Sequence, residues 1–191
     1  MSDPRSMILD LFAGTGSATL PFRECGKHRV IHVDLAPPAE IRCDVRTLPR
    51  WVKNEDWTFV WASPPCTEFS QLSNLRKVHG GPGPRPELGM DLVRVTFNII
   101  RELSPPLWLV ENVRAAEPYI ASEFGPPMFR KDAWCLWGRL PGLFLSTSRR
   151  ILKCGRITYR KRARYPGLDT HQRQQIPRPI SEAVHRAVCE L

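Results

Sequence analysis

The sequence predicts an α/β protein built on a doubly wound, mostly parallel sheet. Short apolar runs alternate with stretches of helical spacing along the 191 residues, the pattern typical of βαβ units. A glycine-rich turn follows the first apolar run, and an acid or a cysteine follows later ones. Because such sheets bind ligands at the carboxyl ends of their strands, we expect one site at that edge.

The elements follow from apolar spacing. Five apolar runs have the length of buried strands, at residues 7–12, 29–33, 57–62, 107–110 and 134–137. Helical spacing predicts three helices, at 18–25, 88–103 and 180–191, the last begun by Pro177 and Pro179. The stretch 115–127 carries prolines and is expected to be irregular.

Composition predicts one globular domain of ordinary type. Hydrophobic residues make up 42% and charged residues 25% of the chain, and no apolar run has the length of a membrane span. The polar stretch 1–7 lacks the apolar core of a signal peptide, so we expect a cytoplasmic protein without membrane contact. The six cysteines include no C-x-x-C pair and no zinc spacing, which favours reduced thiols over disulfides or a structural metal.

The net charge of +9 is concentrated in the last third. Residues 128–191 hold 14 Lys/Arg and 4 Asp/Glu, which leaves 14 basic and 15 acidic residues for 1–127. Eight of the basic residues lie between 149 and 164, without an acid among them. This asymmetry predicts a polyanion partner on one side of the protein. The alternatives are a solvated surface or acidic lipid, and the segment shows little of the apolar face that a membrane helix needs.

The glycine turn and two acids predict a nucleoside cofactor. Gly14 and Gly16 allow backbone N–H groups to approach a ligand after the first strand. Asp34 ends the second strand, 20 residues after Gly14, where an acid can hold a ribose 2′-OH. Asp44 follows a Pro-Pro loop, where it can accept a hydrogen bond from an amino group such as that of adenine. The missing third glycine disfavours NAD, and the absence of a P-loop motif disfavours ATP.

Cys66 and Glu111 are the candidate catalytic pair. Cys66 follows the strand 57–62 on a loop that Pro64 and Pro65 stiffen, and Glu111 follows the strand 107–110. A cysteine is more often a small buried thiol, but this one shares the expected site edge with an acid. A thiol nucleophile beside a proton donor suits covalent catalysis. Because a free thiol has a pKa of about 8.5, Cys66 needs a positive neighbour or a dipole, which the sequence does not identify.

In their order and spacing, these motifs resemble the cytosine-C5 DNA methyltransferase family. Phe12, Gly14, Gly16 and Ser17 match its first motif, Pro65-Cys66 with Phe69-Ser70 its nucleophile motif, and Glu111-Asn112-Val113 its acid motif. The resemblance implies a Rossmann-like, S-adenosylmethionine-dependent methyltransferase fold without a metal. It implies that Cys66 attacks a cytosine flipped out of double-stranded DNA, while Glu111 serves as the acid that stabilises the charge building at N3 of that cytosine. The implied cofactor contacts are Phe12, Ala13, Gly14, Gly16, Ser17, Asp34, Leu35, Asp44, Val45 and Pro65.

The chain departs from the family pattern at three places. The paired arginines that hold the flipped base are replaced by Arg130 and Lys131, which we expect at the substrate together with Ser70. The Asn-Val before the final helix is missing, which puts one cofactor contact in doubt. The target-recognition region is short, at most 139–175, so sequence specificity is slight or a partner protein supplies it. Within it, the residues expected on DNA are Arg160, Lys161 and Arg162.

The expected organisation is a catalytic domain at 1–138, a basic DNA-contacting region at 139–175 and a C-terminal helix at 176–191 that packs back on the catalytic domain. By analogy, the compact form indicates a bacterial or phage protein, with restriction–modification as one role. An RNA cytosine-C5 methyltransferase of the tRNA type is an alternative, although those enzymes carry a second cysteine where this chain has Glu111-Asn112-Val113. A catalytically silent nucleic-acid-binding relative is another, favoured by the altered arginine motif and disfavoured by Cys66 and Glu111. A dehydrogenase would leave both residues unexplained.

Overall fold

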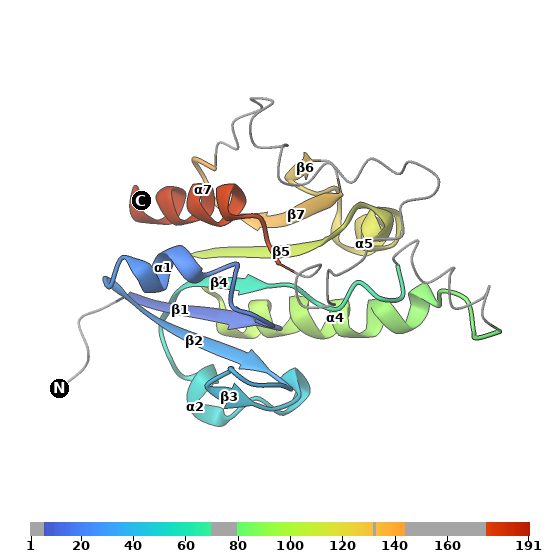
Figure 1. The fold of residues 1–191 in the computed structure, drawn as a ribbon, viewed down its shortest axis with the longest axis horizontal. Helices are drawn as coiled ribbons and strands as arrows, with labels where there is room; N and C mark the ends of the chain where they lie inside the picture. Colours follow the sequence, from blue (N-terminus) through green and yellow to red (C-terminus); the bar gives the residue numbers. More distant parts are fainter. Residues whose placement is uncertain (1–5, 70–79, 132, 144–174) are drawn as a thin grey trace, which may run out of the picture.

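In this computed structural model, residues 6–69, 80–131, 133–143 and 175–191 are described, and they form a seven-stranded sheet (Figure 1). Its order is β3-β2-β1-β4-β5-β7-β6; the first five strands are parallel, β7 pairs antiparallel with β5, and β6 pairs antiparallel with β7. The strands are β1 (Ser6–Leu11), β2 (His28–Asp34), β3 (Ile41–Arg42), β4 (Trp57–Ala62), β5 (Leu107–Val113), β6 (Phe129–Lys131) and β7 (Trp134–Arg139).

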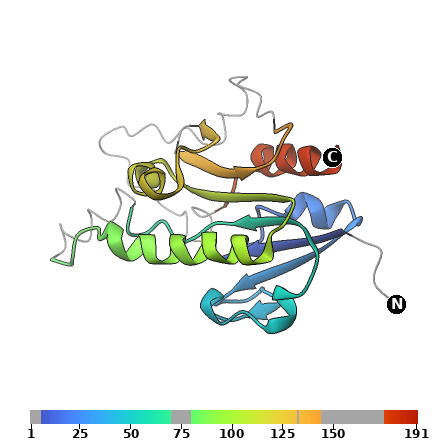
Figure 2. The same cartoon turned by 180° about the vertical axis from the view of Figure 1, so that it is seen from behind.

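Helices cover both faces of this sheet (Figures 1 and 2). One face carries α1 (Leu20–Glu24) and α7 (Arg178–Cys189), and the other carries α4 (Pro86–Leu103) and α5 (Glu117–Phe124). The other helices within the described residues are α2 (Arg50–Lys53), η1 (Val45–Thr47) and η2 (Arg114–Ala116). The doubly wound, mostly parallel α/β fold expected from the sequence is therefore confirmed.

Strand alternation divides the core into two clusters. Leu9 and Leu11 of β1 pack toward α4, whereas Ile8 packs toward α1 and α7. Within α4, buried residues recur at helical spacing, at Met90, Val93, Thr96, Ile99 and Ile100. Each large apolar side chain buried in this way contributes about 1.5–3 kcal/mol, which anchors the loops at the carboxyl edge.

The structure corrects the expectation that 115–127 is irregular. A 3₁₀ turn at Arg114–Ala116 leads into α5, with Pro118 in its first turn and Ile120 fully buried. Proline lacks only an N–H that the first helical turn leaves unbonded anyway, so it begins this helix instead of breaking it. Strand β5 also runs to Val113, beyond the expected 107–110, because β7 continues to pair with it after the parallel pairing with β4 ends.

Helix α7 packs beside α1, on the face opposite α4 (Figure 1). Its buried residues Ile180 and Val184 share a cluster with Phe22 and Phe59. Most of the region 139–175 lies outside the described residues. Within the described part of the chain, no helix is both long and apolar enough to cross a membrane.

Candidate active site

The turn after β1 requires glycine at two positions. Phe12, Gly14 and Gly16 all have positive φ, at 61°, 52° and 72°. A Cβ on Gly16 would also stand 2.5 Å from Cε1 of the buried His32 ring. The turn therefore requires glycine, because glycine adopts a positive φ without strain and its missing Cβ leaves room for the His32 ring. Helix α1 begins only at Leu20, two residues later than expected.

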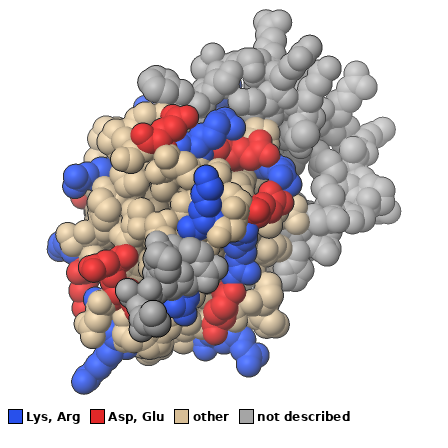
Figure 3. Space-filling model, turned by 90° about the vertical axis from the view of Figure 1, so that its left-hand side faces the viewer, with Lys and Arg blue, Asp and Glu red and all other residues tan. Residues whose placement is uncertain are grey.

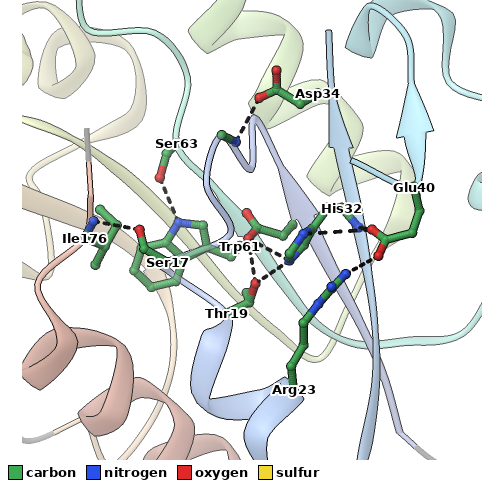
Figure 4. A network of polar contacts seen from close by, with 11 residues as sticks. Ser17, Thr19, Arg23, His32, Asp34, Glu40, Trp61, Ser63 and Ile176 are labelled. Carbon is green, nitrogen blue, oxygen red and sulfur yellow. Dashed lines mark hydrogen bonds and ion pairs between the residues drawn. The ribbon is translucent and has the colours of Figure 1, made fainter. Parts of the chain in front are cut away.

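A polar network supports the turn from below (Figure 4). The Thr19 hydroxyl donates to Oδ2 of Asp10 at 2.7 Å and lies 2.9 Å from Nε2 of His32. Because the hydroxyl has a single proton, the His32 ring donates to it. The backbone N–H of His32 donates to Glu40 at 2.9 Å, and Glu40 pairs with Arg23. This network ties the turn to the neighbouring strand β2.

The two expected cofactor acids lie where their strands end, and both are already hydrogen-bonded. Oδ2 of Asp34 accepts from the N–H of Gly14 at 2.9 Å, and Oδ1 accepts from the N–H of Ala36 at 3.0 Å. Asp44 begins the 3₁₀ turn η1 and accepts from both the N–H and the guanidinium of Arg46, at 2.8 and 2.9 Å. The backbone hydrogen bond of Arg46 is the main cause that lowers the pKa of Asp44. Each carboxylate oxygen keeps a further lone pair for a ligand.

Two hydrogen bonds fix the loop that carries Cys66. The N–H of Ser63 donates to the carbonyl of Leu11 at 3.1 Å, which ties the start of the loop to the end of β1. Nδ2 of Asn112 donates to the carbonyl of Pro64 at 3.0 Å. The residue beside Glu111 therefore holds the loop that carries the thiol, so the acid motif and the cysteine motif form one unit.

A short chain of hydrogen bonds reaches Glu111. Nε1 of Trp61 donates to the Ser63 hydroxyl at 2.8 Å (Figure 4), and this hydroxyl in turn hydrogen-bonds Glu111. Glu111 is buried within β5, opposite Leu136 of β7, and not at the strand end that the sequence predicted. It still lies at the carboxyl edge of the parallel pairing, which ends at Val110.

Burial dominates the electrostatics of the Cys66–Glu111 pair. It raises the pKa of Glu111 to about 7, and the hydrogen bond from Ser63 only partly offsets it. Burial, and then the charge of Glu111, raise the pKa of the half-buried Cys66 thiol. Among the described residues, no positive neighbour acts on the pKa of the Cys66 thiol, whereas a proton on Glu111 removes the repulsion.

A cavity of about 520 Å³ joins these parts at the carboxyl edge of the sheet. Most of the predicted site residues line it: Phe12, Ala13, Gly14, Ser17, Asp34, Leu35, Asp44, Val45, Pro65, Cys66 and Glu111. Gly16 does not, because it lies against His32. Leu35 is 76% exposed, so its side chain offers an uncovered apolar surface at this cavity.

Arg130 and Lys131 lie elsewhere. Both belong to the edge strand β6, and neither lines the cavity. Nε of Arg130 donates to Oε1 of Glu117 at 2.7 Å, an ion pair with the start of α5. The other expected substrate contacts, Ser70, Arg160, Lys161 and Arg162, fall outside the described residues.

Sequence reasoning missed Asp10, a buried acid at the floor of the cavity. Its Oδ1 has no hydrogen-bond partner among the described residues, and burial raises its pKa to about 7. An unpartnered buried oxygen is costly, so it favours a ligand that donates to it. The signal was an acid inside an otherwise apolar strand. The backbone N–H of Ile176, from the segment before α7, donates to Oγ of Ser17 at 2.9 Å at the same cavity (Figure 4).

Comparison with known proteins gives one relative by sequence. The chain is 34% identical over 113 residues to a protein of Frog virus 3 (isolate Goorha) named "Probable DNA (cytosine-5)-methyltransferase". The match covers 55% of this chain and 52% of the relative, so the chain spans about half the relative's length. The sequence similarity is therefore to a protein named for cytosine-C5 DNA methylation, in agreement with the resemblance that the motifs show. No protein-family model matches it.

A solved E. coli structure described as a "putative DNA modification methyltransferase encoded within prophage" also matches, at 22% identity and a TM-score of 0.39. That match covers 56% of this chain and 32% of the other. Most described residues of the motifs that resemble the cytosine-C5 DNA methyltransferases line the cavity, whereas Gly16, Phe69 and Asn112 do not.

Proposed function

We propose that the chain is a DNA cytosine-C5 methyltransferase that uses S-adenosylmethionine. One observation carries the proposal: a single cavity holds Cys66 and Glu111 together with the glycine turn, Asp34 and Asp44. A nucleophile, an acid and a nucleoside-binding set at one sheet edge are what this reaction requires. The name of the viral relative supports the same activity.

The cofactor end of the cavity is assigned to the glycine turn and the acids. The free lone pairs of Asp34 accept hydrogen bonds from the ribose hydroxyls, and Asp44 accepts one from the adenine amino group. Leu35 and Val45 supply apolar surface for the purine ring. The unpartnered Oδ1 of Asp10 accepts a hydrogen bond from the methionine ammonium. When bound, S-adenosylmethionine supplies an electrophilic methyl group.

The chemistry rests on Cys66 and Glu111. The thiolate of Cys66 adds to C6 of a flipped cytosine, and the electron pair displaced from the ring reaches N3, where Glu111 donates its proton. Transfer of the methyl group to C5 would break its bond to sulfur and leave S-adenosylhomocysteine. Glu111 would then take back the N3 proton, and loss of the C5 proton to solvent would expel Cys66 as a thiolate. A pKa of about 7 keeps a substantial fraction of Glu111 protonated at neutral pH, as a general acid requires. The same proton removes the negative charge that disfavours the Cys66 thiolate.

DNA contact is assigned to the region 139–175, between a catalytic body at 1–138 and the helix at 176–191. On the face that Figure 3 shows, described Lys/Arg and Asp/Glu side chains are interspersed. The sequence instead gathers eight basic residues into 149–164. We assign Arg160, Lys161 and Arg162 to phosphate contacts and Ser70 to the base. A region this short leaves room for a partner protein that supplies specificity.

The test is methyl transfer from radiolabelled S-adenosylmethionine to duplex DNA, single-stranded DNA and tRNA, with digestion to identify the labelled base. We expect 5-methylcytosine in duplex DNA and none with Cys66→Ala. Label in tRNA alone would contradict the DNA assignment. Cofactor binding without transfer to any substrate would instead support a silent nucleic-acid-binding relative.

A further inference from the structure

Four soft ligand side chains meet at the amino-terminal edge of the sheet, opposite the cavity. Cys25 caps the C-terminus of α1, and His28 begins β2 three residues later. His185 and Cys189 lie one turn apart on α7, so they share one face of that helix. The two pairs form a C-x₂-H and an H-x₃-C half-site that only the folded chain brings together.

The ligand atoms are spaced as a metal requires. Those of Cys25, His28 and His185 all lie within 4.8 Å of one another. Sγ of Cys189 lies 3.5 Å from Nε2 of His28 and 3.4 Å from Nε2 of His185. A tetrahedral zinc ion with Zn–S of about 2.3 Å and Zn–N of about 2.1 Å separates sulfur from nitrogen by about 3.6 Å. The two sulfur–nitrogen distances of Cys189 match this separation, and the ligand atoms of the other three residues lie within 4.8 Å of one another.

Neighbouring side chains fix both imidazoles. The ring of Phe22 contacts His28 and His185 edge to face, with centroids 5.2 and 4.9 Å apart. The Ser6 hydroxyl hydrogen-bonds Nδ1 of His28, which leaves Nε2 directed at Cys189. A hydrogen bond to the second ring nitrogen is the usual way to orient a metal-binding histidine.

Packing alone explains this cluster poorly. The thiols have only weak hydrogen bonds, such as that of Cys25 to the carbonyl of Phe22 at 3.2 Å, and Cys189 is exposed. Two thiols and two imidazoles are the ligand set of structural zinc, whereas magnesium and calcium require oxygen ligands.

We propose that Cys25, His28, His185 and Cys189 bind one Zn²⁺ ion that fastens α7 to the junction of α1 and β2. Four protein ligands fill a tetrahedral shell and leave no position for water, so the site is structural and not catalytic. Binding replaces the two thiol protons with Zn–S bonds and releases two protons to solvent. The sequence-based expectation of no metal considered spacing within one segment only, whereas the two halves of this cluster lie far apart in the chain.

The first test uses reduced, metal-free wild-type protein. Titration with Co²⁺ should give the intense visible absorption of tetrahedral cobalt with thiolate ligands, at one ion per chain. Added Zn²⁺ should abolish this absorption and, in a separate titration of the metal-free protein, release about two protons per ion bound. Elemental analysis after dialysis should find one zinc per chain. These measurements do not depend on whether a variant folds.

Variants then assign the ligands. Cys189→Ser and His185→Ala should each abolish the cobalt spectrum while circular dichroism shows a folded protein. Ser6→Ala should weaken zinc binding by about 10–100-fold, because it removes only the orienting hydrogen bond. Cys43→Ser is the matched control at the opposite edge of the sheet and should retain one zinc.

Three results would overturn the proposal. The first is that reduced, folded wild-type protein gives no tetrahedral cobalt spectrum and retains no zinc after dialysis. The second is that the Cys43→Ser variant loses as much bound metal as the Cys189→Ser variant. The third is that the purified protein carries a Cys25–Cys189 disulfide and binds no zinc after this disulfide is reduced.

Discussion

Glu111→Gln should make the fold increasingly more stable than wild type as the pH rises from 4 to 8. Burial moves the pKa of this carboxyl from 4.5 to about 7. Between these values the folded chain keeps the proton that the unfolded chain has released, so wild type loses stability as the pH rises. Above pH 7 the loss is complete, at about 3 kcal/mol for a fully buried group. Glutamine cannot ionise and avoids this loss.

The assay is urea denaturation of both proteins at half-unit steps of pH, followed by tryptophan fluorescence. The free energy of unfolding of the variant minus that of wild type should rise by about 3 kcal/mol across the range. Taking the difference cancels the titrating groups that Glu111 does not influence, together with any constant effect of the amide on the hydrogen bond to Ser63. Cys66, which Glu111 does influence, has its pKa raised from 9.0 and so titrates above this pH range.

Glu117→Gln provides a control of opposite sign. The hydrogen bond from Arg130 lowers the pKa of Glu117, so this carboxylate adds stability at neutral pH that is lost in acid. Relative to wild type, that variant should lose stability as the pH rises. A flat or falling difference for Glu111→Gln would refute the account of a buried, proton-retaining acid.

Further predictions concern the thiol, the cofactor and DNA. Alkylation of Cys66 by iodoacetamide should shift to lower pH in Glu111→Gln, because the negative charge that raises the thiol pKa is gone; an unchanged profile would show that the two groups are not coupled. Asp34→Ala should weaken S-adenosylmethionine binding in calorimetry and leave cofactor-free DNA affinity unchanged; equal losses would indicate misfolding. Reversing the charges of residues 160–162 should weaken binding to all DNA sequences alike and flatten its salt dependence, which is about 0.9 log units per phosphate contact per tenfold salt. Unchanged affinity and slope would show that this segment is a solvated face.

The parallel core was predictable because its strands are continuous apolar runs. Residues 57–62 alone predict a buried strand, and the register between β1 and β4 then aligns their carboxyl ends. Helix α5 was missed because Pro118 was interpreted as a breaker, although it lies in the first turn of that helix. Strands β3 and β6 have two and three residues, too few for a periodic signal.

The site was predictable where it depends on strand ends. Asp34 is the last residue of β2, and Cys66 lies four residues after the end of β4, so topology brings both to one edge. The hydrogen bonds of Ser63 to Glu111 and of Asn112 to Pro64 depend on side-chain directions that spacing does not give. The cysteine–histidine cluster was invisible for a similar reason, since its halves lie near the two ends of the chain.

Covalent trapping on duplex DNA that contains 5-fluorocytosine tests the central claim most directly. Fluorine at C5 cannot leave as a proton, so the adduct that forms after methyl transfer persists. With S-adenosylmethionine present, we predict a stable protein–DNA adduct, and peptide mass spectrometry should find the modified base on Cys66 and not on Cys43, a second described thiol that lines the cavity. An adduct on Cys43, or none from a protein that methylates ordinary duplex DNA, would contradict the proposed role of Cys66.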